Sequence, residues 1–210
     1  MKVLLVGGSG MVGTFVTPYL AAHHELRVLD VRPPRHADLV DYVPGSITDP
    51  DDLARALEGM DTFIDLVMRP GGDPEPTAED IIANYGVNTL GVHLLLWTAH
   101  QQGIRAGIYV STRTVHNLPA TAEGRPTYIQ AEETMQLDNP GVYGLTKGIG
   151  ERICQYFAQH YGMRIIALRI TGPRTREAFI AERRTPIHPG LYVMDDEDLA
   201  NARWRPCAWS

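Results

Sequence analysis

Apolar residues fall into short runs that alternate with longer stretches in which they recur every three or four positions. A short apolar run predicts a buried strand, and the wider spacing predicts one face of a helix. The expected strands are Lys2–Val6, Leu26–Asp30, Asp41–Pro44, Asp61–Met68, Ile104–Ser111 and Met163–Ile170. The expected helices are Met11–Ala22, Asp51–Leu57, Thr77–Gln102 and Pro140–Tyr161. Because strands and helices alternate, we expect an α/β fold: a doubly wound parallel sheet with helices on both faces.

Two longer polar stretches, Arg69–Pro76 and Asn117–Asn139, interrupt this alternation. The first follows a strand at its carboxyl end, where open α/β sheets bind ligands. We expect the second to cover the same edge, since long loops in such positions are often functional lids.

Length, charge and cysteine content narrow the class of protein. A chain of 210 residues fits one domain, with or without a small addition. A formal net charge of -6 argues against the basic surface that nucleic acid or an anionic membrane needs. No apolar run approaches the roughly 20 residues of a membrane span. Cys154 and Cys207 lie far apart without metal-ligand spacing, so we expect free thiols, no metal site and a cytoplasmic location.

A glycine-rich turn joins the first strand to the first helix. Gly7, Gly10 and Gly13 are spaced three apart, with Met11 and Val12 opening the helix. Glycine lets the backbone approach a pyrophosphate closely, and a helix N-terminus offers free N–H groups and a positive dipole end to it. Such a triplet also occurs in ordinary tight turns, but a strand before it and a helix after it favour phosphate binding.

Asp30 ends the second strand, about 20 residues beyond the turn, where dinucleotide-binding domains place an acid that binds the adenosine ribose. A carboxylate accepts hydrogen bonds from both ribose hydroxyls and repels a 2′-phosphate. Asp30 therefore favours NAD over NADP, whereas Arg32 and Arg35 provide charge that would soften this preference.

Tyr143 and Lys147 are four residues apart, hence on one face of a helix. A tyrosine has a reference pKa of about 10, and a neighbouring ammonium favours its phenolate form, bringing it toward use as an acid or base. Taken alone, such a pair is more often surface decoration than a catalytic site. A hydroxyl pair, Ser111-Thr112, ends the preceding strand and strengthens the catalytic interpretation.

Further motifs follow in order, namely Asn88-Thr89-Leu90-Gly91, Tyr109-Val110-Ser111-Thr112 and Leu168-Arg169-Ile170-Thr171-Gly172-Pro173. Together with the glycine turn, they make the chain from Met1 to about Arg174 resemble the extended short-chain dehydrogenase/reductases, the NAD-dependent epimerase/dehydratase family. The resemblance implies a Rossmann-like NAD-binding domain over residues 1–174 and a remnant of a substrate-binding lobe over residues 175–210. It also implies a shortened product or a reduced enzyme, since family members normally continue further.

The resemblance assigns roles residue by residue. Tyr143 corresponds to the catalytic acid/base, Lys147 to its activator and ribose ligand, and Thr112 to the catalytic hydroxyl. Ser46 stands where an acid usually precedes the adenine contact, and Asn88 has a packing role as an alternative. The remaining implied cofactor contacts are Ile47, Leu66, Val67, Met68, Ser111, Thr171 and Pro173.

The same comparison argues against one activity. Sugar-nucleotide 4,6-dehydratases carry an Asp-Glu pair directly after the catalytic threonine, whereas Arg113-Thr114 follows Thr112 here. His116 stands where many epimerases have tyrosine, and a lone histidine is more often structural or substrate-adjacent than catalytic.

Two functions remain open from the sequence. The first is an NAD-dependent oxidoreductase or epimerase that acts on a sugar, a sugar nucleotide or a related hydroxy compound by hydride transfer. The second is a non-catalytic NAD-binding module, either a redox sensor or a truncated remnant. The presence of Thr112, Tyr143 and Lys147 together favours the enzyme. The resemblance also implies a homodimer formed through the helices predicted at Thr77–Gln102 and Pro140–Tyr161.

Overall fold

A computed structural model describes residues 1–70, 75–116 and 141–182. Within them, six parallel strands form one sheet in the order β3-β2-β1-β4-β5-β6. The strands are β1 (Lys2–Val6), β2 (Glu25–Asp30), β3 (Asp41–Pro44), β4 (Thr62–Asp65), β5 (Ala106–Thr112) and β6 (Arg164–Ile170). The predicted α/β fold with a parallel, Rossmann-like sheet is therefore confirmed.

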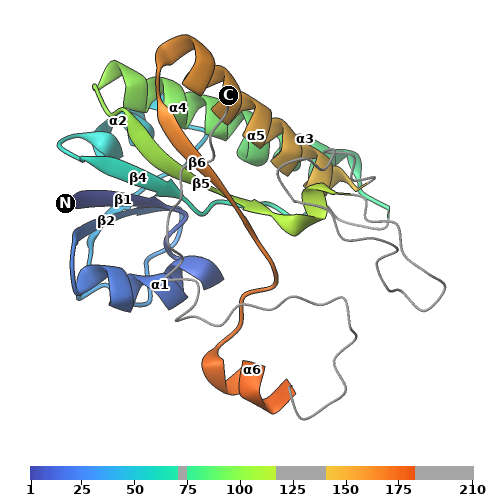
Figure 1. Cartoon of the computed structure of the whole chain (residues 1–210), viewed down its shortest axis with the longest axis horizontal. Coiled ribbons are helices and arrows are strands. Elements are labelled where there is room, and N and C mark those ends of the chain that lie inside the picture. The colour runs from blue at the N-terminus through green and yellow to red at the C-terminus, as the bar shows by residue number, and fades with distance from the viewer. Residues whose placement is uncertain (71–74, 117–140, 183–210) are drawn as a thin grey trace.

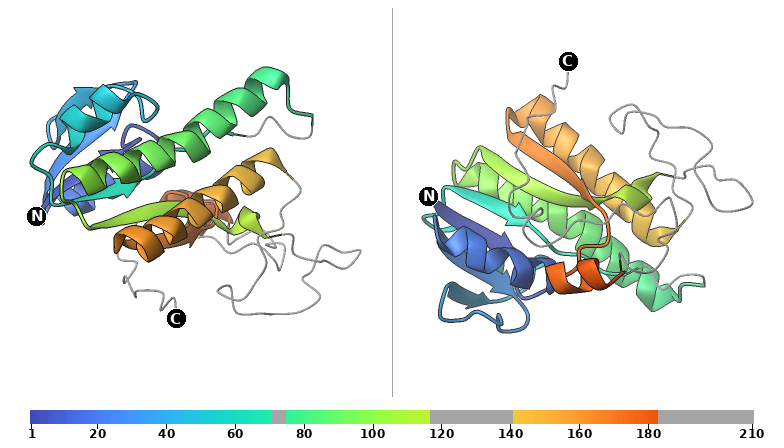
Figure 2. Two further views of the ribbon diagram at one scale, coloured as in Figure 1. Left: turned by 90° about the horizontal axis from the view of Figure 1, so that it is seen from above. Right: turned by 60° about the horizontal axis from the view of Figure 1, so that its bottom comes forward.

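Helices cover both faces of the sheet, as predicted (Figures 1 and 2). One face packs against α1 (Met11–Ala21), and the other packs against α2 (Pro50–Leu57), α4 (Gly91–Gln101) and α5 (Val142–Tyr161). Successive side chains of a strand point to opposite faces, so β1 contributes to both cores. Leu4 and Val6 pack on the side of α2, α4 and α5, whereas Val3 and Leu5 pack on the side of α1.

The strand order places a topological switch point beside β1. The chain passes from β1 outward to β2 and β3, and then returns to the other side of β1 to form β4. Connections that diverge in this way leave a crevice at the carboxyl ends of the strands, where doubly wound sheets bind ligands. The fold thereby brings the end of β1, the glycine turn and the segment after β4 to one place.

Local signals set most of the boundaries within one or two residues of the prediction. The Asp49 carboxylate accepts hydrogen bonds from the N–H groups of Asp51 and Asp52 at 2.9 and 3.1 Å, and Pro50 begins α2. The capping aspartate and the proline at the first helical position thus set the start of α2. At the end of α5, Gly162 adopts a left-handed conformation with a φ of 64°, which stops the helix.

The strand predicted over Asp61–Met68 is too long, because β4 ends at Asp65. The Leu66 N–H still donates to the Val6 carbonyl at 2.8 Å, but the Asp65 carboxylate then accepts from the Val67 N–H at 3.0 Å. A side chain that bonds the backbone two residues ahead competes with the strand ladder. The chain therefore leaves the sheet while its sequence is still apolar.

The single helix predicted over Thr77–Gln102 has three parts: α3 (Ala78–Tyr85), a π-helical segment η1 (Gly86–Leu90) and α4. They follow one another without a break (Figure 2), so apolar periodicity alone does not separate them. Thr77 caps α3 in a capping box with Asp80. π-Helical turns inside helices occur frequently at functional sites, and η1 carries Asn88.

A short helix, α6 (Arg176–Glu182), follows β6 and lies beyond the last predicted element. The rest of the predicted lobe remnant, from residue 183 to residue 210, lies outside the described residues. The predicted loop Asn117–Asn139 lies wholly outside them, as do residues 71–74 of the predicted loop Arg69–Pro76. Among the described helices, none is long and apolar enough to cross a membrane.

Candidate active site

The glycine turn is shaped by contacts that exclude a side chain. Gly7 has a φ of 78°, a conformation that favours glycine. A Cβ added to Gly13 would lie 2.1 Å from the Gly8 carbonyl oxygen. The first turn of α1 therefore packs directly on the loop before it, and this packing keeps the helix N-terminus close to the carboxyl end of β1.

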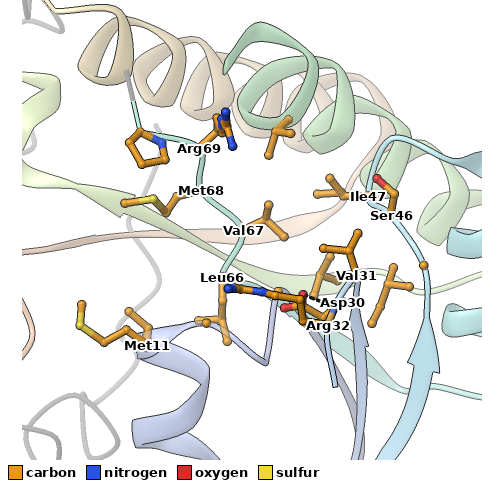
Figure 3. Close-up of a pocket in the computed structure, with 18 residues that line it drawn as sticks. Met11, Asp30, Val31, Arg32, Ser46, Ile47, Leu66, Val67, Met68 and Arg69 are labelled. Carbon is orange, nitrogen blue, oxygen red and sulfur yellow. Dashed lines mark hydrogen bonds between the residues drawn. The ribbon is translucent and has the colours of Figure 1, made fainter. Parts of the chain in front are cut away.

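A cleft of about 580 Å³ opens beside this turn (Figure 3). Its walls come from the glycine turn, the end of β2, the segment after β3 and the segment after β4. The predicted cofactor residues that line it are Gly7, Gly10, Met11, Val12, Asp30, Arg32, Ser46, Ile47, Leu66, Val67 and Met68. Arg69 and Pro70, from the loop expected at the ligand-binding edge, also line it, as do residues that the sequence analysis missed, namely Val6, Leu29, Val31, Gly45 and Val87. Gly13 supports the cleft from behind.

Asp30 is fixed at the rim of the cleft by backbone groups (Figure 3). Its carboxylate accepts hydrogen bonds from the Ser9 N–H at 3.0 Å and the Arg32 N–H at 3.1 Å. The Ser9 hydroxyl in turn donates to the Arg32 carbonyl at 2.7 Å. These bonds join the glycine turn to the end of β2 and hold the carboxylate in a fixed orientation.

Two asparagines hold the segment after β4 that forms the opposite wall. Asn88 accepts from the Arg69 N–H at 2.9 Å and donates to the Arg69 carbonyl at 3.0 Å. Asn84, which the sequence analysis missed, donates to the carbonyls of Arg69 and Pro70 at 2.8 and 2.7 Å. Thr146 of α5 donates to Asn84 at 2.5 Å. Asn88 is absent from the cleft lining and supports it through the backbone, in line with the packing alternative.

The predicted catalytic residues lie at the end of β5 and in the first two turns of α5. Tyr143 is half-buried and forms a hydrogen bond with the Thr112 side chain. Lys147, one turn further along α5, is fully buried, and its ammonium nitrogen lies 3.4 Å from the Val67 carbonyl oxygen. Val67 also lines the cleft, so the lysine connects the tyrosine side of the site to the cleft wall.

The electrostatics of Tyr143 differ from the expectation that Lys147 lowers its pKa. Burial raises the pKa of Tyr143, and the hydrogen bond with Thr112 only opposes that rise. The ammonium group of Lys147 instead contacts the Val67 carbonyl and lies 4.2 Å from the centre of the Tyr109 ring. In this arrangement Tyr143 holds its proton at neutral pH.

The chain also matches known proteins along most of its length. The model of the NAD dependent epimerase/dehydratase family matches residues 3–188. The chain belongs to this family. The matched residues include the glycine turn, Asp30, Thr112, Tyr143 and Lys147.

Characterised relatives of this family member include sugar dehydrogenases. The chain is 29% identical over 177 residues to L-arabinose 1-dehydrogenase (NAD(P)(+)) of Haloferax volcanii, covering 80% of this chain and 66% of that enzyme. It is 25% identical over 176 residues to uronate dehydrogenase of Pseudomonas syringae, covering 80% of this chain and 58% of the relative. The chain thus spans at most about two thirds of their length.

Solved structures agree on the fold. UDP-glucose 4-epimerase of Thermus thermophilus in complex with NAD superposes with a TM-score of 0.76 at 21% sequence identity, covering 96% of this chain and 73% of that one. At this identity the similarity concerns the fold alone.

Some residues that the family resemblance assigned to the cofactor lie apart from the cleft. The Ser111 hydroxyl donates to Glu151 of α5 at 2.5 Å, in a buried position. The Glu151 carboxylate also pairs with Arg169 at 2.7 Å, and Arg169 lies 3.1 Å from the ring of His116. These contacts connect Ser111 and His116 to the buried Glu151–Arg169 pair, and a cofactor contact for Ser111 stays a prediction.

Two further assignments follow β6, at the carboxyl end of the sheet. Thr171 is half-buried and Pro173 is buried, but neither lines the cleft. A cofactor contact for Thr171 and Pro173 therefore stays a prediction.

Proposed function

We propose that this chain is an NAD-dependent oxidoreductase or epimerase that acts on a sugar, a sugar nucleotide or a related hydroxy compound. Two observations support the proposal: Tyr143 forms a hydrogen bond with Thr112, and Lys147, one helical turn after Tyr143, contacts Val67 in the wall of the glycine-lined cleft. Cofactor binding alone does not require these three groups together, so the arrangement favours turnover over a binding module.

The cleft fits NAD by its shape and its donor groups. The turn Gly7–Gly13, which has no room for a side chain at Gly7, Gly8 or Gly13, would hold the pyrophosphate at the N-terminus of α1. Asp30 would bind the adenosine ribose, and Ser46 and Ile47 would lie along the adenine. Leu66–Met68 would form the wall that leads toward Lys147. The fixed carboxylate of Asp30 makes NAD the preferred cofactor over NADP.

Tyr143 supplies the proton chemistry. Hydride transfer to or from the carbinol carbon of the substrate is the chemistry that bound NAD would supply. The Tyr143 hydroxyl gives a proton to the substrate oxygen during reduction, and the phenolate takes it during oxidation. Thr112, hydrogen-bonded to Tyr143, orients that hydroxyl and would share the substrate oxygen. Because burial raises the pKa of Tyr143, oxidation should accelerate as the pH rises above neutrality.

The proposal includes a homodimer. Seven aromatic and histidine side chains of α4 and α5 pack against one another, and we call them the aromatic face: His93, Trp97, His100, Tyr156, Phe157, His160 and Tyr161. Trp97 and Tyr156 remain exposed on it. Large exposed aromatic side chains on adjacent helices are typical of an interaction surface.

Tyr143→Phe tests the enzymatic proposal. The variant removes the proton donor and keeps the ring, so we expect turnover to fall by about 10²–10⁴-fold while NAD binding is unchanged. Turnover is measured as NADH formation with a panel of aldoses, uronates and sugar nucleotides, and as epimer formation with the nucleotides. Tyr85→Phe, an exposed tyrosine of α3, is the matched control and should keep full activity.

Equal activity of Tyr143→Phe and the unaltered chain would refute the catalytic role of Tyr143. NAD binding without turnover on any substrate of the panel would instead support the non-catalytic module.

A further inference from the structure

A carboxylate is buried directly beneath the cleft wall. Asp65 ends β4 and is 1% exposed. One carboxylate oxygen accepts from the Val67 N–H at 3.0 Å. The other, Oδ2, has no hydrogen-bond partner within the part of the chain that the structure describes. Burying a carboxylate without a partner costs free energy, and a nearby positive charge offsets that cost.

Lys147 converges on the same peptide group. Its ammonium nitrogen lies 3.4 Å from the Val67 carbonyl oxygen, while Asp65 binds the Val67 N–H. Tyr109 lies next to Asp65 on β5, and the Lys147 nitrogen is 4.2 Å from the centre of its ring. Both charged groups therefore sit in one buried space between β4, β5 and α5, behind a residue that lines the cleft.

We propose that Asp65 is a positioning residue of the active site, whose buried carboxylate keeps Lys147 in the ammonium form beside the cleft. This inference rests on the proposed function, in which the Lys147 ammonium group lies against Val67 in the wall of the NAD cleft. Asp65 itself does not reach the cleft, since it is absent from the lining. It acts through Lys147.

The titratable neighbours of Lys147 leave Asp65 as its principal counter-charge. Tyr109 on β5 and Cys154 on α5 are buried, and burial raises the pKa of each, so both are neutral near pH 7. Tyr143, four residues before Lys147, holds its proton for the same reason.

Glu151, four residues after Lys147, is the other nearby carboxylate. It is already paired with Arg169 and accepts from Ser111. Burial lowers the pKa of Lys147 to about 8, and Asp65 is the strongest of the charges that oppose this decrease. Burial likewise raises the pKa of Asp65 to about 6, which leaves a window around neutral pH in which both groups are charged.

The lysine content of the chain makes a direct measurement possible. Lys2 and Lys147 are the only lysines, so a chain labelled with ¹³C at the lysine ε-carbon gives two side-chain signals, which Lys2→Arg assigns. We expect Asp65→Asn to lower the pKa of Lys147 by about one unit or more, because an opposite charge has been removed. Asn keeps the size of the side chain and an acceptor for the Val67 N–H.

Cys154→Ala is the matched control, since it alters a buried neighbour of Lys147 that carries no charge near pH 7. It should leave the Lys147 titration unchanged. An unchanged titration in Asp65→Asn, or an equal shift in Cys154→Ala, would overturn the proposal. Should Asp65→Asn lack a cooperative thermal transition, the unaltered chain provides the test: its Lys147 signal must show a second inflection near pH 6 as Asp65 gains a proton.

Activity distinguishes this inference from the function on which it rests. In Asp65→Asn, the pH at which kcat for the reduction falls because Lys147 loses its proton should decrease by the same amount as the pKa in the titration. If the unaltered chain neither binds NAD nor turns over any substrate, the proposed function fails, whatever the titration shows. If the unaltered chain is active and both profiles are unaffected by Asp65→Asn, only the role of Asp65 fails.

Discussion

Three carboxylates around the cleft differ in the partners that surround them. Asp30 accepts from two backbone N–H groups at the rim, and Glu151 is neutralised by Arg169 in the interior. Asp65 is buried with one oxygen unpartnered. Because an oriented carboxylate at the rim can still accept bonds from a ligand, Asp30 is the group that we expect to select the cofactor.

Asp30→Asn tests that role. The substitution removes the charge that repels a 2′-phosphate, so we expect the preference for NAD over NADP to fall by about tenfold, or about 1.4 kcal/mol. The ratio of the two dissociation constants from calorimetry provides the measurement. Glu25→Gln, which removes a charge at the opposite end of β2, is the control and should leave the ratio unchanged. A ratio that is also unchanged in Asp30→Asn would exclude Asp30 from cofactor selection.

At the scale of elements, the contact between the glycine turn and α1 holds the cleft together. Gly13→Ala would bring a Cβ to 2.1 Å from the Gly8 carbonyl oxygen, and this backbone cannot yield as a flexible side chain would. We expect the free energy of unfolding to fall by about 1–3 kcal/mol and NAD affinity to decrease with it. Urea denaturation and calorimetry measure the two effects.

Gly86→Ala is the matched control in a helical position. An added Cβ at Gly86 meets no atom within 4 Å, so the substitution should raise stability by about 0.5–1 kcal/mol. Equal effects of the two substitutions would contradict the close packing of Gly13.

The elements were largely predictable because their patterns are local. Apolar runs marked every strand of the sheet, and Asp49 and Pro50 marked the start of α2. The early end of β4 was not predictable from hydrophobicity, because Leu66–Met68 stay apolar after leaving the ladder. The π-helical segment was not predicted either. It continues the direction of α3 into α4, so the apolar periodicity does not distinguish it from an α-helix.

Part of the candidate site could also be predicted, because its residues belong to motifs that follow one another in a fixed order along the chain. Ordered motifs singled out Tyr143 and Thr112, and a hydrogen bond joins these two residues at the start of α5 and the end of β5; their catalytic roles stay predictions. The sequence analysis did not select Asn84 and Asp65 as site residues, although the sequence contains a signal for each. Asn84 lies one helical turn before Asn88, and Asp65 is an acid within an apolar strand. Their partners come from distant elements, so only the tertiary fold reveals what they do.

At the scale of the whole molecule, the aromatic face bears on assembly. Trp97 is 43% exposed there, close to Tyr161 and His100. If two copies pair through this face, Trp97→Glu should convert a dimer into a monomer, because it places a charge in a buried contact. Light scattering after size-exclusion chromatography measures the mass.

Leu39→Glu is the control for the dimer, since Leu39 is 40% exposed in the connection between β2 and β3, at the other edge of the sheet. It should leave the mass of the dimer unchanged. A monomeric mass for the unaltered chain would rule out this assembly.

The central claim is that the glycine turn, Asp30 and the segment after β4 form a site for NAD. Calorimetric titration of the 210-residue chain with NAD and, separately, with NADP tests it most directly. The account predicts saturable one-to-one binding of NAD, weaker binding of NADP by about tenfold or more, and loss of NAD binding in Gly13→Ala. Absence of binding for both nucleotides by a folded chain would contradict the account.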